Sequence, residues 1–162
     1  MKRFDRPLLG YVSRSHVEAI IGAPNTATWT GRRDRVMFAT LYNTGARVSE
    51  LIGMRVADVI LEGSPTVRIL GKGRKERTVP LWSATAVQLR RWLRERHATA
   101  EQPVFPNRAG GLLSRTTVTE RLQLAVDVAA KRYPELLKQS ISPTRFVTRS
   151  RCICSNPASI SP

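Results

Sequence analysis

The chain of 162 residues carries 27 Lys and Arg against 12 Asp and Glu, which gives a formal net charge of +15. With 41% hydrophobic and 24% charged residues, it is apolar enough to bury a core, which excludes a compositionally disordered chain. No apolar run reaches the length of a membrane span, and residues 1–10 lack the apolar centre of a secretory signal, so we expect a cytoplasmic protein without a membrane partner. The excess of positive charge, mostly arginine, favours a polyanionic partner such as nucleic acid.

The first third of the chain predicts helices. Ser13 is a plausible N-cap for a helix over 13–22, which Gly22 ends. The polar stretch 23–33 predicts a loop that can contain the start of the next helix. Residues 34–42 are apolar on nearly every side and predict a buried central helix. Residues 43–45 interrupt it, and a second short helix is expected over about 47–52.

The middle of the chain changes to a strand pattern. A short apolar run over 58–61 is followed by the turn 62–65. Residues 66–70 alternate between apolar and polar, 71–74 form a glycine-rich basic turn, and 75–81 indicate the returning strand. The pattern predicts a small three-stranded antiparallel sheet with a basic hairpin tip.

Two further helices are expected in the last third. Ser83 and Ser114 are the expected caps, and an extended connection through 104–111 separates the helices. The residues expected to face inward are Val87, Leu89, Trp92 and Leu93 in the first helix, and Val118, Leu122, Ala125, Val126 and Ala129 in the second. After Pro143 the sequence has neither helical nor strand period, so no regular element is predicted there.

Two motifs carry the chemistry. The first is Thr44-Gly45-Ala46-Arg47-Val48-Ser49-Glu50-Leu51, and the second, beyond a strand, is Gly71-Lys72-Gly73-Arg74-Lys75-Glu76-Arg77. Cations held in fixed positions stabilise the charge that develops on phosphate oxygens, and a guanidinium fork matches those oxygens in pairs. With Val104-Phe105-Pro106 and Ile141-Ser142-Pro143, this ordered set resembles the tyrosine recombinase (phage integrase) family, bacterial integrase branch, over about residues 13–143.

The resemblance implies both a fold and an activity. The expected fold is α+β: a mainly helical catalytic domain with a small three-stranded antiparallel sheet, truncated at its C-terminal end. The family carries out site-specific DNA recombination and integration through a 3′-phosphotyrosyl intermediate. We therefore expect double-stranded DNA as the partner, a possible homo-oligomer on DNA, and no metal, nucleotide cofactor or small-molecule substrate.

The resemblance also assigns site residues. Arg47 matches the first catalytic arginine, which clamps the scissile phosphate, and Lys72 matches the hairpin lysine, which protonates the departing 5′ oxygen. Glu50, one helical turn beyond Arg47, either orients that arginine or is an ordinary surface acid. The residues expected to contact DNA phosphates are Arg74, Lys75 and Arg77.

The sequence departs from the family pattern after Pro143. The family has a His-x-x-Arg motif there and later a nucleophilic tyrosine, whereas this sequence has no His after His97 and no Tyr after Tyr133. Cys152 and Cys154 indicate neither a disulfide framework nor a metal site.

Residues 144–162 suggest a shifted reading frame. One choice of codons for this tail, read with a single C restored in front of it, encodes a His-x-x-Arg-His motif and then an amphipathic helical pattern. We therefore expect three segments: a linker remnant over 1–12, a partial catalytic domain over 13–143, and an aberrant, disordered tail over 144–162. Apolar surface on 36–42 and 114–129 would then lie uncovered.

These observations leave function classes open. We expect a fragment that binds DNA phosphates but cannot cleave, because covalent catalysis needs its nucleophile. A non-enzymatic basic DNA-binding or regulatory protein built on the same fragment is the alternative. A general RNA-binding protein is disfavoured, because residues 56–81 offer no aromatic side chain on which bases could stack.

Overall fold

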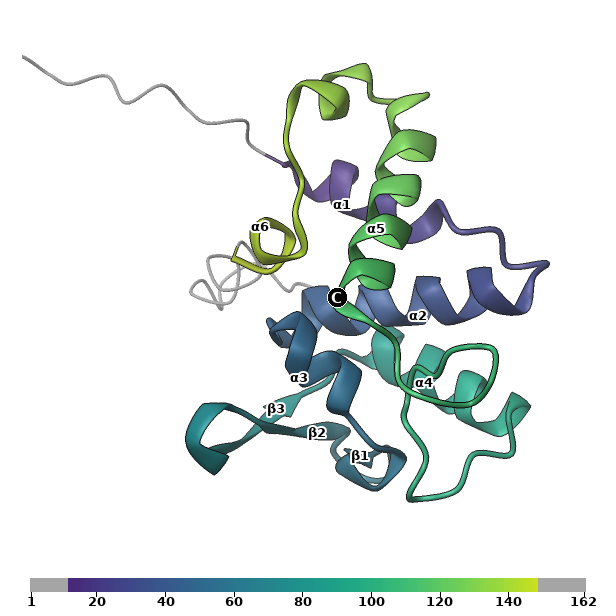
Figure 1. The fold of residues 1–162 in the computed structure, drawn as a ribbon, viewed down its shortest axis with the longest axis vertical. Coiled ribbons are helices and arrows are strands. Elements are labelled where there is room, and N and C mark those ends of the chain that lie inside the picture. The colour runs from purple at the N-terminus through teal and green to yellow at the C-terminus, as the bar shows by residue number, and fades with distance from the viewer. Residues whose placement is uncertain (1–11, 149–162) are drawn as a thin grey trace, which may run out of the picture.

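The computed structural model describes residues 12–148, in which helix α2 crosses the middle of the molecule (Figure 1). On one side of it lie α1, α5 and α6, and on the other lie α3, α4 and the sheet. The helices are α1 (Arg14–Gly22), α2 (Trp29–Thr44), α3 (Val48–Gly53), α4 (Ser83–Glu95), α5 (Arg115–Ala130) and α6 (Pro143–Thr148), the strands are β1 (Val59–Ile60), β2 (Thr66–Leu70) and β3 (Glu76–Pro80), and 3-10 turns cover Val56–Asp58, Lys72–Arg74 and Pro134–Lys138.

The sheet has the predicted topology. Its three strands follow the order β1-β2-β3, and both pairs are antiparallel. Val67 pairs with Val59 on one side and with Val79 on the other. Val67 and Ile69 are buried, because alternate residues of a strand point to the same face. The α+β class, mainly helical with a small antiparallel sheet, is therefore confirmed.

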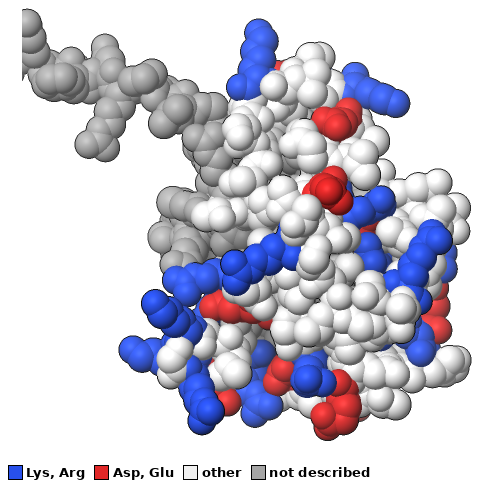
Figure 2. Space-filling model, viewed as in Figure 1, with Lys and Arg blue, Asp and Glu red and all other residues white. Residues whose placement is uncertain are grey.

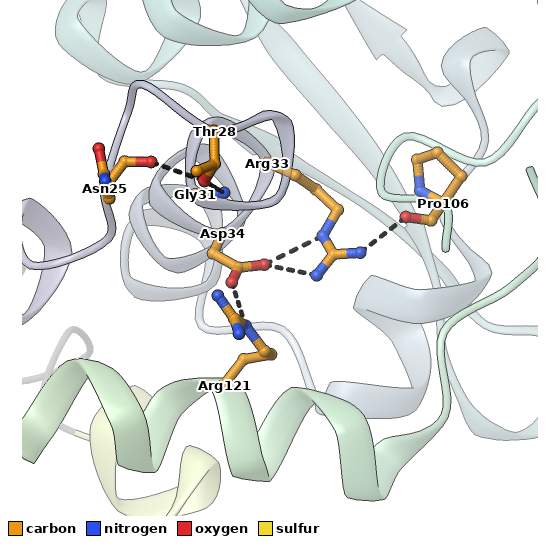
Figure 3. Close-up of polar contacts among 7 residues, drawn as sticks. All are labelled: Asn25, Thr28, Gly31, Arg33, Asp34, Pro106 and Arg121. Carbon is orange, nitrogen blue, oxygen red and sulfur yellow. Dashed lines mark hydrogen bonds and ion pairs between the residues drawn. The ribbon is translucent and has the colours of Figure 1, made fainter. Parts of the chain in front are cut away.

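Helix α2 begins earlier than the apolar pattern indicates. Its N-cap is Thr28, whose hydroxyl accepts a hydrogen bond from the N–H of Gly31 at 3.0 Å and donates one to the carbonyl of Asn25 at 3.0 Å (Figure 3). A Cβ on Gly31 would lie 1.8 Å from that carbonyl oxygen, so only glycine fits there. The helix therefore starts inside the polar stretch 23–33, as the sequence allowed, and before the apolar pattern that begins at residue 34, because a capping hydroxyl rather than hydrophobicity sets its first residue.

A buried ion network anchors α2 to the rest of the molecule. The Nε and Nη2 of Arg33 both donate to Asp34 Oδ1, at 3.0 and 2.7 Å (Figure 3). The Nη1 of Arg33 donates to the carbonyl of Pro106 at 3.1 Å. Arg121 of α5 donates to the other oxygen of Asp34. Arg33 and Asp34 are 3% and 1% exposed, so each charge depends on the others for compensation. No motif in the sequence predicts this network.

The serine caps of α1 and α5 are confirmed. Ser13 accepts from the N–H of His16 and Ser114 from that of Thr117. His16 itself is buried, and its Nε2 lies 2.8 Å from an oxygen of Glu135, which ties α1 to the segment after α5. The residues of α5 that were expected inside are all buried: Val118, Leu122, Ala125, Val126 and Ala129.

Helix α4 corrects two predictions. Ser83 is the first helical residue rather than the cap, and the N–H of Trp82 donates instead to the side chain of Asn43 at 2.8 Å. Val87 is 59% exposed rather than inward-facing, whereas Leu89 is fully buried. Residues two apart on a helix lie about 200° apart, so these two side chains cannot face the same core.

A short helix, α6, occupies a segment for which no regular structure was predicted. Phe146 is 3% exposed, and its ring lies 5.6 Å from that of Tyr42 on α2. The expectation that no regular element follows Pro143 is therefore wrong for residues 144–148, and residues 149–162 lie outside the described part of the chain. Residues 36–42 are all buried, contrary to the expected uncovered surface, whereas α5 does expose Leu124 at 52% and Val128 at 48%.

Candidate nucleic-acid interface

Arg47 lies at the turn between α2 and α3. Gly45 ends α2 with φ of +63°, a left-handed conformation that glycine adopts without strain, and its N–H donates to the carbonyl of Leu41 at 3.1 Å. Arg47 follows as the N-cap residue of α3 in an extended conformation, and it is exposed. The turn thus presents the guanidinium at a helix start, as the motif predicts.

Glu50 holds this turn through its backbone rather than through the Arg47 side chain. One carboxylate oxygen accepts the Arg47 N–H at 2.9 Å. Both oxygens accept from the guanidinium of Arg77 on β3, at 3.2 and 2.8 Å. The hydrogen bonds from Arg77, followed by that from the Arg47 N–H, hold the pKa of Glu50 below its ordinary value, against the opposing effect of burial. The same pairing raises the pKa of Arg77.

The tip of the β2–β3 hairpin carries three exposed cations. The Gly71 N–H donates to the carbonyl of Lys75 at 2.8 Å and closes the tip, where Gly73 and Arg74 both have positive φ, +73° and +58°. Lys72, Arg74 and Lys75 are exposed, and within residues 12–148 none of these side chains has a hydrogen-bond or ion-pair partner. Their charges are therefore available to a ligand.

Glu50 brings the Arg47 turn and the hairpin together. Its carboxylate bonds to Arg47 and Arg77 and also lies close to the hairpin backbone. A Cβ added to Gly71, the residue before Lys72, would lie 3.2 Å from Glu50 Oε1. The hairpin base and α3 are therefore packed against each other. Figure 2 shows basic side chains gathered on the side of the molecule where the hairpin lies. We call Arg47, Lys72, Arg74 and Lys75 the basic interface.

Arg77 differs from the other predicted phosphate contacts. It lies opposite Ile69 in the register, and opposite residues of an antiparallel pair share one face of the sheet. Its side chain is 37% exposed and engaged by Glu50, so it stabilises the hairpin base. The alternation of β3 indicates this structural role, because it places Arg77 with Val79 on the half-buried face of the strand.

Other kinds of site find no support in the described residues. Within 12–148, no cluster of His, Cys, Asp and Glu could hold a metal ion, and Cys152 and Cys154 lie beyond that range. Among the helices over the same residues, none combines the length and the apolar character that crossing a bilayer requires.

Comparison with known proteins defines the class. The model of the phage integrase family matches residues 11–141, so the chain belongs to that family, the tyrosine recombinases. It is 36% identical over 145 residues to the integrase/recombinase y4rC of Sinorhizobium fredii, a match covering 90% of this chain and 44% of that protein. It is 41% identical over 115 residues to the tyrosine recombinase XerC of Xanthomonas axonopodis pv. citri, which covers 69% of this chain and 37% of XerC.

The fold agrees with this assignment. The structure of the XerH site-specific recombinase bound to its difH substrate aligns with a TM-score of 0.73 at 20% identity. The alignment covers 90% of this chain and 43% of XerH. The chain thus spans less than half the length of these relatives.

Proposed function

We propose that the chain binds double-stranded DNA through the basic interface and that this surface belongs to a site-specific recombination machinery. The observation that supports the proposal is the position of Glu50, which couples the backbone of Arg47 to the base of the hairpin that carries Lys72. Two cations that have no side-chain partner within residues 12–148, held on coupled elements, suit neighbouring oxygens of one DNA backbone. XerH, which has the same fold, is bound to its difH substrate in the aligned structure.

We assign the roles by the family motif. Arg47 contacts the scissile phosphate and stabilises charge on its non-bridging oxygens, and Lys72 protonates the leaving 5′ oxygen. Arg74 and Lys75 position the flanking phosphates. The homo-oligomer on DNA and the cytoplasmic location expected from the sequence remain predictions.

We further propose that the 162-residue polypeptide on its own binds DNA without cleaving it. Its sequence contains no His after His97 and no Tyr after Tyr133, so the His-x-x-Arg motif and the attacking hydroxyl are missing from the positions where the family has them. Loss of one transition-state donor typically costs about 3–4 kcal/mol, and loss of the nucleophile removes the covalent step. Binding and cleavage are therefore expected to separate in this polypeptide.

Salt-dependent binding tests the interface. Each phosphate contact contributes about −0.9 to the slope of log K against log salt. We expect Arg47→Ala and Lys72→Ala each to reduce that slope by about one and to weaken binding at every salt concentration. The matched control is Arg108→Ala, because Arg108 is exposed, has no hydrogen-bond or ion-pair partner within residues 12–148, and lies on a loop far from the hairpin in sequence. Equal losses in all three variants would show that only net charge matters.

A suicide substrate tests cleavage separately. Duplex DNA with a 5′-bridging phosphorothiolate traps a recombinase as a covalent adduct, which a denaturing gel detects. We expect no adduct with the 162-residue chain, even at salt concentrations at which binding is complete. An adduct would overturn the proposed inactivity and leave the binding proposal intact. Failure to bind duplex DNA at low salt, or tighter binding of single-stranded RNA, would overturn the DNA proposal.

A further inference from the structure

A second basic site lies in a pocket between α2 and α4. The pocket has a volume of about 320 Å³, in the range of small-molecule sites. Its lining includes the buried ring of Trp92 and, around it, the polar side chains Arg32, Arg35, Arg91, Glu95 and Gln88. Figure 2 shows basic side chains at the edge of the molecule where α2 begins.

The pocket carries uncompensated positive charge. Arg32 is engaged by Glu95, with N–O distances of 2.8 and 2.7 Å, and by the carbonyls of Thr26 and Ala27. Arg35 and Arg91 are exposed, and within residues 12–148 neither guanidinium has a hydrogen-bond or ion-pair partner. Three arginines and one glutamate give the lining a net charge of +2.

This pocket is separate from the basic interface. Arg35 lies nine residues before Thr44, the last residue of α2, which corresponds to about 13–14 Å along the helix axis at 1.5 Å per residue, and Arg47 lies in the turn beyond that end. Arg91 belongs to α4, which supplies no member of the basic interface. A ligand of the pocket would therefore not occupy the position of the phosphate that Arg47 contacts.

We propose that the pocket binds a phosphate monoester. A monoester carries a charge of about −1.5 to −2 at pH 7, which matches the +2 of the lining, whereas a diester or a single carboxylate carries −1. Arg35 and Arg91 approach from two helices, and each can donate a pair of hydrogen bonds to phosphate oxygens. The Oε1 of Gln88 is buried without a hydrogen-bond partner among the described residues, so a hydroxyl next to the phosphate would supply a donor it lacks.

Calorimetry at constant ionic strength tests the charge requirement. The probe is phenyl phosphate, and methyl phenyl phosphate, a diester of similar shape, is its comparison. We expect the monoester to bind the full chain at least about tenfold more tightly than the diester. Arg35→Gln and Arg91→Gln should each weaken the monoester about tenfold, whereas Arg94→Gln, at an exposed arginine of α4 outside the lining, should change it less than about twofold.

Three outcomes would overturn the proposal. They are equal affinity for monoester and diester, equal losses in Arg94→Gln, and loss of monoester binding in Lys72→Ala while the pocket variants bind normally. Two further arms identify the source of the phosphate without depending on the DNA proposal. A preference for DNA with a 5′-phosphate over 5′-hydroxyl DNA, lost in Arg35→Gln, assigns the pocket to DNA ends. Binding of phenyl phosphate without that preference assigns it to small phosphorylated molecules.

Discussion

Replacing Glu50 with glutamine isolates the link between α3 and the hairpin. Gln keeps the shape and can still accept the Arg47 N–H, but it loses the charge and the two-oxygen acceptance of Arg77. Hydrogen bonds to charged groups contribute about 1.5–3 kcal/mol, and the 37% exposure of the Arg77 side chain reduces this through solvent screening. We therefore expect Glu50→Gln to lower the free energy of unfolding by about 1–2 kcal/mol.

Denaturant and thermal unfolding measure this loss. For a chain of this size, each kcal/mol corresponds to a fall of about 2–4 °C in Tm. The control is Glu62→Gln, which removes the same charge from an exposed turn and should stay within about 0.5 kcal/mol of the parent. DNA affinity distinguishes the effect of the hairpin's position from the effect of net charge. Both variants lose one negative charge, but only Glu50→Gln loosens the hairpin. Equal stability and equal DNA affinity of the two variants would refute the reasoning.

Three other predictions follow from burial and ionisation. Asp34→Asn leaves the buried Arg33 without its counter-charge and should cost about 3–5 kcal/mol in urea unfolding, whereas the exposed Asp127→Asn should cost little. Leu89→Ala should cost about 2–5 kcal/mol in the same assay and Val87→Ala less than about 0.5. Because the folded pKa of Glu50 is lowered, its stabilisation is complete above its ordinary value of 4.5 and is lost as pH falls through the folded pKa, so the Glu50→Gln difference should shrink in acid unfolding titrations.

Local sequence signals predicted the elements whose boundaries are set locally. Ser13 and Ser114 accept from the backbone of the following turn, and the alternation of β2 matches its buried face. The start of α2 was located only to the stretch 23–33 and not to a residue, because Thr28 and Gly31 lie in a polar segment without hydrophobic period. Helix α6 was not predicted because it has only 6 residues, too few to display a helical period of apolar side chains.

The positions of the candidate residues in the fold were predictable where they depend on the motif alone. The placement of Arg47 at a helix start and of Lys72 at a hairpin tip follows from Gly45, Gly71 and their neighbours. The partner of Glu50 was not predicted, because Arg77 reaches it from a strand 27 residues away and only the fold decides that meeting. The pocket between α2 and α4 has no linear signature for the same reason, since its arginines come from two elements.

The carboxylate of Asp34 constrains the order in which the chain can fold. Its partner on α5 lies 87 residues later, and the Pro106 carbonyl that Arg33 reaches lies 73 residues later. While the chain emerges from the ribosome, α2 and the β2–β3 hairpin can form from near neighbours, but the second oxygen of Asp34 lacks its partner until Arg121 has been synthesised. The core around α2 therefore closes late, and a nascent chain that stalls before residue 121 exposes the apolar helix at its centre.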